Sequence, residues 1–351
     1  MNKVFLILFI IISTSLGMLS LNKFEDFFKI TKIDVKLIYP SYFPKISYSF
    51  AKNKLTPDKF VLGRKLFYDE ILSKDNTVSC ASCHERIAAF AHIDHKLSHG
   101  IYAKIGTRNV PPIQNLIWRT SFMWDGGVNH IEIQPLSPIE NPIEMDEKMS
   151  NVLLKLKNDP VYVSLFKKAY KDSEITSERI FKSLTQFMGL MISSNSRYDK
   201  FNQQKDTLSK MEMNGLTLFR AKCASCHTEP LFTNNGFANN GLKVDTSLND
   251  EGRYKITKNE KDKYAFTIPS LRNIEMTYPY MHDGRFKKII DVLNFYNEGQ
   301  NHNATVDQRV TSIGKLSVQE KKELNAFLLT LTDKTFLYDR RFIDPDYVFS
   351  R

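Results

Sequence analysis

All four cysteines of this 351-residue chain lie in two copies of one pentapeptide, Cys-Ala-Ser-Cys-His. The first copy spans residues 80–84 and the second spans residues 223–227. Because every thiol belongs to the same short pattern, we expect the cysteines to serve a single chemical purpose. Whatever the first copy binds, the second copy is expected to bind as well.

Three uses of this pattern can be compared. A disulfide within Cys-x-x-Cys is short, and it leaves the adjacent histidine without a role. A zinc site would require the two copies to meet across about 140 residues of chain. Covalent attachment of a c-type haem uses every residue, since the two thiols add to the vinyl groups and the histidine binds the iron. We therefore predict two haem c groups, held by Cys80, Cys83 and His84 and by Cys223, Cys226 and His227.

A second repeat accompanies the first. The residues 63–67 and 215–219 both read Gly-x-x-Leu-Phe, and each lies shortly before a Cys-Ala-Ser-Cys-His segment. Two similar units, each enclosing one haem, are the simplest explanation of this repetition. The fold class predicted is mainly α-helical, with two cytochrome c-like domains, each carrying one covalently bound c-type haem and preceded together by an export signal.

Helical patterns occur on both sides of the haem segments. Thr56 and Pro57 have the N-cap and first-turn pattern of a helix that continues to Leu66. Residues 176–193 place apolar side chains at helical spacing, and Ser317 with Glu320 forms a capping box ahead of another amphipathic segment. Strand patterns are scarce. We predict domains over residues 23–205 and 206–351, with the junction in the polar segment 196–210.

The N-terminus is typical of an exported protein. One lysine precedes the apolar run 4–12, and small residues follow over 13–17. This is the order of a secretory signal, and the run is short for a membrane span of about 20 residues. We predict that residues 1–22 are a signal peptide, or else an uncleaved anchor, and that the protein is periplasmic.

The charge balance is basic, with 49 Lys and Arg against 39 Asp and Glu. Such a balance fits nucleic acid, an anionic membrane surface or an acidic protein. The lysines are scattered rather than clustered, so we expect no nucleic-acid partner and favour an acidic protein. A homodimer is also compatible with the sequence.

Five short segments outside the haem pentapeptides resemble one known family. They are Arg108–Pro111, Trp124–Gly126, Asn141–Met145, Pro269–Asn273 and Pro279–Gly284. Their order and their position around two haem segments resemble the bacterial dihaem cytochrome c peroxidases, a family that also contains the MauG-type enzymes. The resemblance extends from about Pro57 to Leu331. It implies a haem-dependent oxidoreductase that acts on hydrogen peroxide.

The resemblance implies three residues for the peroxide chemistry. Cleavage of peroxide on iron needs a group that moves a proton from the inner to the outer oxygen, and a carboxylate above the iron does this. Glu144 matches the family's distal acid, and Gln134 matches the amide beside it. Trp124 matches the tryptophan between the two haems, where an indole can relay an electron.

The axial position of the second haem distinguishes the two branches. The peroxidase branch has a methionine 14 residues beyond the histidine of the His-Asp-Gly element, whereas this chain has Tyr296 at that distance from His282. MauG-type members carry tyrosine there. A thioether raises the potential of the iron and a phenolate stabilises Fe(III), so the ligand matters for function. Met276 and Met281 are the nearby substitutes.

Two further sites are implied by the same resemblance. Asn109 matches a side-chain ligand of a bound Ca²⁺, and Thr277 and Pro279 match positions that supply backbone carbonyls to it. His99 is the nearest match to a histidine that caps the first haem in the resting peroxidases. His92 and His95 lie nearby in the sequence but match less well.

Three functions remain open from the sequence. The first is a cytochrome-c peroxidase that reduces H₂O₂ to water with electrons from a small redox protein, a cytochrome c or a cupredoxin. The second is a MauG-type enzyme that uses peroxide to oxidise side chains of a partner protein. The third is a dihaem electron-transfer cytochrome without catalysis. We rank them in this order.

Overall fold

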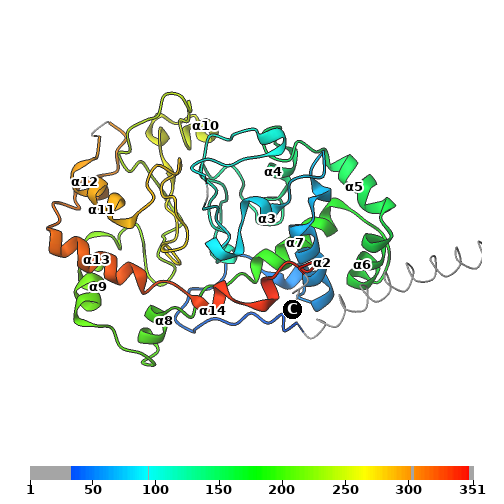
Figure 1. Cartoon of the computed structure of the whole chain (residues 1–351), viewed down its shortest axis with the longest axis horizontal. Coiled ribbons are helices and arrows are strands. Elements are labelled where there is room, and N and C mark those ends of the chain that lie inside the picture. The colour runs from blue at the N-terminus through cyan, green and yellow to red at the C-terminus, as the bar shows by residue number, and fades with distance from the viewer. Residues whose placement is uncertain (1–32, 94, 302–303, 348–351) are drawn as a thin grey trace, which may run out of the picture.

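The computed structural model describes residues 33–93, 95–301 and 304–347. These residues form two lobes side by side, with the helices mostly at the outer ends and long loops where the lobes meet (Figure 1). The prediction of a mainly α-helical fold is confirmed, since the only sheet among the described residues is the two-stranded pair of β1 (Phe237–Ala238) and β2 (Phe266–Thr267). The first lobe contains α2 (Pro57–Tyr68), α3 (Cys80–Cys83), α4 (Leu136–Glu140), α5 (Met149–Asn158), α6 (Pro160–Tyr170) and α7 (Ser177–Gly189). The second contains α8 (Arg197–Asn202), α9 (Lys210–Lys222), α10 (Tyr254–Thr257), α11 (Ile289–Glu298), α12 (Gln308–Thr311) and α13 (Val318–Leu329), and α14 (Lys334–Leu337) follows.

Short 3₁₀ helices mark the loops and the C-terminal segment. They are η1 (Phe50–Lys52), η2 (Glu70–Leu72), η3 (Arg86–Ala88), η4 (Ile101–Ala103), η5 (Leu116–Trp118), η6 (Glu260–Asp262) and η7 (Arg340–Phe342).

The same helix crossing occurs once in each lobe. In the first lobe α2 packs against α7, and in the second α9 packs against α13. The glycine of each Gly-x-x-Leu-Phe repeat lies at the crossing. A Cβ atom at Gly63 would be 1.9 Å from the carbonyl oxygen of Ser183, and one at Gly215 would be 2.0 Å from that of Glu323. The glycine of each repeat therefore allows the backbones of the two crossing helices to approach more closely than any other residue would permit.

The helix termini follow the predicted caps. The Thr56 hydroxyl accepts from the backbone N–H of Lys59 at 3.3 Å, and Ser317 and Glu320 form the expected reciprocal capping box. These interactions satisfy backbone donors that have no partner inside the helix. The first helix extends two residues beyond the predicted end at Leu66.

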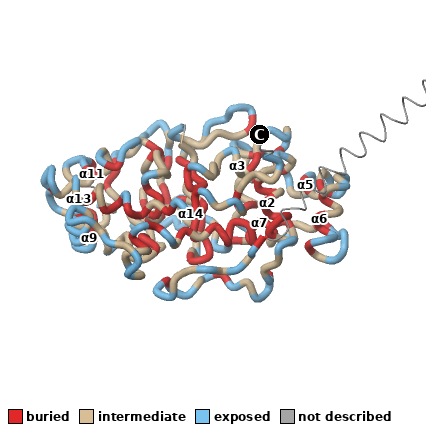
Figure 2. The backbone as a smooth tube through the Cα atoms, turned by 60° about the horizontal axis from the view of Figure 1, so that its bottom comes forward, coloured by how far each residue is buried: buried red, intermediate tan, exposed pale blue. Residues whose placement is uncertain are grey.

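Each lobe has its own hydrophobic core, and buried residues also continue through the region between the lobes (Figure 2). The C-terminal segment crosses from the second lobe to the first. Phe336, Leu337 and Phe342 are buried in the core of the first lobe, where Phe342 packs edge-on against Phe90 and Phe187. The boundary at residues 205 and 206 stays a prediction, and residues 334–342 tie the end of the chain to the first core.

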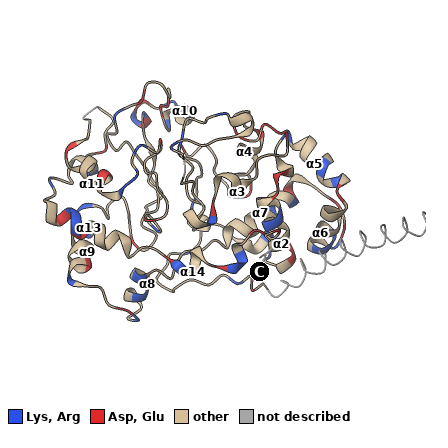
Figure 3. Cartoon of the chain, viewed as in Figure 1, with Lys and Arg blue, Asp and Glu red and all other residues tan. Residues whose placement is uncertain are grey.

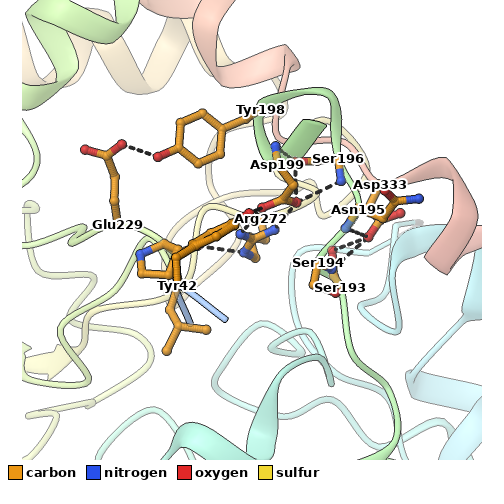
Figure 4. Close-up of polar contacts among 12 residues, drawn as sticks. Tyr42, Ser193, Ser194, Asn195, Ser196, Tyr198, Asp199, Glu229, Arg272 and Asp333 are labelled. Atoms are coloured by element: carbon orange, nitrogen blue, oxygen red, sulfur yellow. Dashed lines mark hydrogen bonds and ion pairs between the residues drawn. The ribbon is translucent and has the colours of Figure 1, made fainter. Parts of the chain in front are cut away.

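A fully buried ion pair lies near the junction of the lobes (Figure 4). Arg272 donates two hydrogen bonds to the carboxylate of Asp199, at 2.7 and 2.8 Å, and both side chains are completely buried. The hydroxyl of Tyr42 donates to the same carboxylate at 2.8 Å. Burial raises the pKa of Asp199, but the hydrogen bonds and charge of Arg272 outweigh it, so that this pKa lies below its usual value.

The residue that follows Arg272 connects three segments of the chain. The Asn273 side-chain amide donates to Gln114 of the first lobe at 2.5 Å and to Ser193 of the connecting segment at 3.0 Å. Its carbonyl oxygen accepts from the backbone N–H of Asp333 at 2.7 Å. Because these groups are buried, each hydrogen bond that fails to form would leave an unsatisfied polar atom. The arrangement fixes the two lobes relative to one another.

The predicted signal or anchor, residues 1–22, lies outside the described residues. Among the residues that are described, no helix combines the length and the apolar character that crossing a bilayer requires.

We predict that Gly63→Ala and Gly215→Ala each destabilise the dihaem protein by about 1–3 kcal/mol, because the added methyl group forces two helices apart. Chemical denaturation followed by far-UV circular dichroism measures the free energy of unfolding. Gly127→Ala is the matched control, since its Cβ would meet only side-chain atoms at 3.1 Å, and we expect a change within about 0.5 kcal/mol. Equal effects at all three positions would contradict the assignment of the crossings.

Candidate haem sites

The first histidine is held by a backbone carbonyl. His84 ends the short helix α3, which begins with a capping box between Ser79 and Ser82. The Nδ1 atom of His84 lies 2.8 Å from the carbonyl oxygen of Phe90. A carbonyl can only accept, so Nδ1 carries the proton and Nε2 keeps the lone pair that binds a metal. Burial lowers the pKa of His84 to about 4, which keeps the imidazole neutral.

The second histidine is held in the same way. The Nδ1 atom of His227 lies 3.2 Å from the carbonyl oxygen of Phe232 and 3.1 Å from that of Pro269. Burial lowers its pKa to about 4 as well. Phe90 and Phe232 both have a positive φ, of 61° and 55°, and both are completely buried. The sequence analysis missed these two acceptors, although each is a phenylalanine five or six residues beyond a haem-binding histidine.

No disulfide bond links any of the four cysteines. Burial raises the pKa of Cys80 to about 12, of Cys83 to about 11 and of Cys223 to about 12. No group of three or more His, Cys, Asp or Glu side chains in the described part of the chain is placed to hold one metal ion. The disulfide and zinc alternatives therefore have no support in the structure.

A cavity lies beside the first pentapeptide. Its empty volume is about 530 Å³, and Cys80, Cys83 and His84 form part of its wall. The predicted site residues Gln134, Glu144 and His99 line the same cavity. Apolar side chains complete the wall, among them Phe67 of the first Gly-x-x-Leu-Phe repeat and Met188 of α7.

Glu144 is the acidic side chain of this wall. Its carboxylate accepts a hydrogen bond of 2.8 Å from the side-chain amide of Asn141. Burial raises the pKa of Glu144, and the hydrogen bond from Asn141 opposes this effect in part. Gln134 has its amide nitrogen 3.6 Å from the sulfur of Met123. A carboxyl group with a raised pKa in a largely apolar cavity is suited to accepting and returning a proton.

His99 is the one histidine of its segment that lines the cavity. Its ring contacts that of His95, with centroids 4.2 Å apart. His95 Nδ1 lies 3.1 Å from His92 Nε2, and His92 Nδ1 lies 3.2 Å from a carboxylate oxygen of Glu85. His92 and His95 thus form a cluster next to the cavity rather than part of its wall, and a role for His99 as an iron ligand stays a prediction.

A larger cavity, of about 1020 Å³, lies beside the second pentapeptide and is lined by Cys226 and His227. Tyr296 of α11 and Met281 both line it, and the side-chain nitrogen of Asn240 lies 3.4 Å from the hydroxyl of Tyr296 and 3.4 Å from the sulfur of Met281. Burial raises the pKa of Tyr296 to about 12. Met276 packs against the core of the first lobe instead, so two candidate axial ligands remain.

The two tryptophans occupy different places. Trp124 is buried, lines the second cavity, and donates from Nε1 to the carbonyl oxygen of Asn109 at 2.8 Å. Trp118 packs edge-on against Tyr39 and donates to the carbonyl oxygen of Pro44 at 2.8 Å. Trp124 is thus next to the haem cavity of the second lobe, and a role as a relay between the haems stays a prediction.

The three residues implied for a Ca²⁺ site also line the second cavity. They are Asn109, Thr277 and Pro279. The side-chain nitrogen of Asn109 donates to the carbonyl oxygen of Lys96 at 3.0 Å, and its backbone N–H donates to that of His282 at 2.6 Å. The three residues lie around one cavity, and Ca²⁺ binding stays a prediction.

Each cavity fits a covalently attached haem. The first wall includes both thiols and the imidazole of its pentapeptide, and the second includes Cys226 and His227. In each site Nδ1 of the histidine is already bound to a carbonyl, and the rest of the wall is largely apolar. Such a carbonyl contact fixes the tautomer and the orientation of a metal-binding histidine. Bound haem would supply a redox-active iron at each site.

Comparison with known proteins gives three results. Residues 57–207 match the model of the di-haem cytochrome c peroxidase family. The methylamine utilization protein MauG of Methylorubrum extorquens is 33% identical over 80% of this chain and 79% of its own length. The cytochrome c551 peroxidase of Nitrosomonas europaea is 31% identical over 78% of this chain and 80% of its own length.

A solved structure agrees with these relatives. A MauG-like protein associated with microbial copper homeostasis superimposes with a TM-score of 0.80 and 30% identity, over 88% of this chain and 99% of that protein. Both kinds of enzyme are therefore similar to this chain along most of its length. The chain belongs to the family of dihaem cytochrome c peroxidases and MauG-like enzymes, as its motifs predicted.

Proposed function

We propose that this protein is a cytochrome-c peroxidase that reduces H₂O₂ to water with electrons from a small redox protein. The observation that carries the proposal is the shared cavity of His84, Glu144 and Gln134. It combines a haem attachment site with an acidic side chain and an amide, which an electron carrier does not need. Membership of the family supports a haem peroxidase-type oxidoreductase in general.

The residues of the first cavity take separate roles in this proposal. The carboxylate of Glu144 accepts the proton of the inner peroxide oxygen and returns it to the outer one, which then leaves as water. Gln134 orients peroxide through its amide. Asn141 holds the carboxylate of Glu144 in place through the 2.8 Å hydrogen bond.

The residues of the second cavity serve electron transfer in this proposal. His227 would hold the iron of the second haem, and Trp124 would relay electrons from this cavity toward the first. Tyr296 is the proposed axial ligand, with Met281 as the alternative. In the proposed arrangement, the domain of residues 23–205 carries the peroxide-binding haem and the domain of residues 206–351 carries the electron-transfer haem.

A MauG-type activity is the second candidate, because Tyr296 reaches the second cavity. A phenolate on the iron favours Fe(III) over Fe(II), whereas a peroxidase that receives electrons through this haem benefits from a higher potential. In that case peroxide would drive the oxidation of side chains on a partner protein. The chain is about as similar to a methylamine utilization protein MauG as it is to a cytochrome c551 peroxidase. The relatives therefore support the MauG-type candidate and the peroxidase candidate equally.

The partner and the compartment follow from the sequence arguments. The chain has a formal net charge of +10, and Lys and Arg are interspersed with Asp and Glu along the ribbon (Figure 3). We propose that the electron donor is an acidic protein. We also propose that this chain is exported to the periplasm by the signal at residues 1–22.

We predict that Glu144→Gln lowers peroxide turnover by roughly 10²–10⁴-fold, because an amide cannot accept the proton. Stopped-flow measurement of peroxide consumption with a reduced cytochrome c checks this. Glu140→Gln is the control, since Glu140 lies in the same segment but is exposed. Full activity of the Glu144 variant with intact haem spectra would favour the electron-transfer cytochrome.

The pH profile of turnover provides an independent test. Since burial raises the pKa of Glu144, its carboxylate is lost at a higher pH than for an exposed glutamate, and the acid limb of kcat/KM lies above the usual value near 4.5. Asn141→Ala removes a hydrogen bond that lowers this pKa. We expect the acid limb to move to higher pH in this variant, and an unchanged limb would exclude Glu144 as the titrating group.

The ligand of the second haem separates the two candidate functions. We predict that Tyr296→Met raises the reduction potential of that haem, since a thioether favours Fe(II) over Fe(III). Redox titration followed by EPR measures the potential of each haem. Met281→Leu is the matched control and should leave both potentials unchanged, whereas a fall in potential for Met281→Leu would assign the ligand to Met281. If the wild-type protein turns over peroxide with a reduced donor protein, the peroxidase is supported. If it does not, the MauG-type activity is supported.

A further inference from the structure

A third cavity lies where the two lobes meet. Its empty volume is about 480 Å³, and both tryptophans, Trp118 and Trp124, line it. It adjoins the second haem cavity, because the two share the wall residues Pro112, Trp124, Thr267, Pro269 and Ser270. It shares none of the wall residues described for the first haem cavity. A group that extends out of the second haem cavity can therefore enter it.

One cation lines this third cavity. Arg119 donates from Nε to the carbonyl oxygen of Ser121 at 3.2 Å and from Nη2 to the hydroxyl of Thr267 at 2.6 Å. Both partners are uncharged. Within the described ranges no Asp or Glu side chain lies within ion-pair distance of Arg119. Burial lowers the pKa of Arg119 to about 10, so that the guanidinium is still charged at neutral pH.

Two other arginines near the junction differ in this respect. Arg108 forms ion pairs of 2.6 Å with Asp125 and with Asp250, and Arg272 pairs with Asp199. A buried charge without a partner is costly, and proteins retain one where a ligand supplies the opposite charge. The guanidinium of Arg119 therefore favours an anionic occupant of the third cavity.

We propose that Arg119 binds a carboxylate, namely a propionate of the haem attached through Cys223 and Cys226. Haem carries two propionates, and a planar guanidinium suits a carboxylate better than any other side chain does. The inference rests on haem attachment at the second pentapeptide and not on the choice between the two candidate activities. Arg119 is here a positioning residue, which fixes one edge of the second haem beside Trp124.

The charge of Arg119 predicts the direction of an electrochemical effect. A cation that pairs with the propionate offsets a negative charge near the iron, and this favours the reduced form. We expect Arg119→Gln to lower the reduction potential of the second haem alone. The expected shift corresponds to about a tenfold change in the reduction equilibrium, or about 59 mV for one electron.

Redox titration of the dihaem protein, followed by EPR to separate the two haems, tests the proposal. Arg119→Lys keeps the charge and should restore most of the potential. Arg253→Gln is the control, because Arg253 also bonds a backbone carbonyl, that of Asp125, and lines none of the three cavities described. No shift for Arg119→Gln, or an equal shift of both haems, would overturn the proposal.

Two measurements on the wild-type protein keep the test valid if Arg119→Gln does not fold. A crystal structure of the dihaem form should place a propionate oxygen within hydrogen-bond distance of the Arg119 guanidinium. Titration with acetate distinguishes the two sources of a carboxylate. A saturable change in the second haem's potential would identify Arg119 as a site for free anions and overturn the proposal, whereas an unchanged potential supports the propionate.

Discussion

The buried pair of Arg272 and Asp199 is the interaction on which the arrangement of the two lobes depends. Two charges removed completely from water are tolerated only when each satisfies the other, and removal of one partner typically costs about 3–5 kcal/mol. Arg272 also donates to the carbonyl oxygen of Pro230, in the loop that follows the second haem-binding histidine. Asn273, the next residue, bonds the first lobe and the connecting segment. A single dipeptide therefore links the geometry of the second haem site to the position of the first lobe.

The haem-binding histidine of each site is oriented by the same kind of hydrogen bond. A histidine at the end of a helical turn donates from Nδ1 to the carbonyl of a buried phenylalanine in the left-handed conformation. Each lobe also contains one close helix crossing, at Gly63 or at Gly215. The two sites differ in the other polar residues of their walls. Glu144 and Gln134 line the first cavity, whereas Tyr296 and Met281 line the second, and this difference assigns peroxide chemistry to one lobe and electron transfer to the other in the proposed function.

The arginines between the lobes differ in whether the protein supplies them with a carboxylate partner. Arg108 and Arg272 are neutralised by aspartates of the protein itself, and Arg119 is not. Near the junction, Arg119 thus differs from Arg108 and Arg272, and under the proposal a haem propionate supplies its missing carboxylate. A propionate in that place would join the second haem to the wall that contains Trp124. The position of the haem and the position of its proposed electron relay would then depend on the same group of residues.

The sequence by itself determined the chemistry that repeats along the chain. The two pentapeptides predicted the attachment sites, the Gly-x-x-Leu-Phe repeats predicted two similar units, and the caps at Thr56 and Ser317 predicted helix starts, because these features depend on residues close together in the chain. Short motifs also led to the family and to Glu144, Gln134 and Tyr296 as candidates. Only the tertiary structure decided which candidates share a cavity, that Met276 lies away from the second haem site, and that Arg119 has no carboxylate partner. These facts depend on segments that are far apart in the sequence, and local patterns carry no information on how such segments pack.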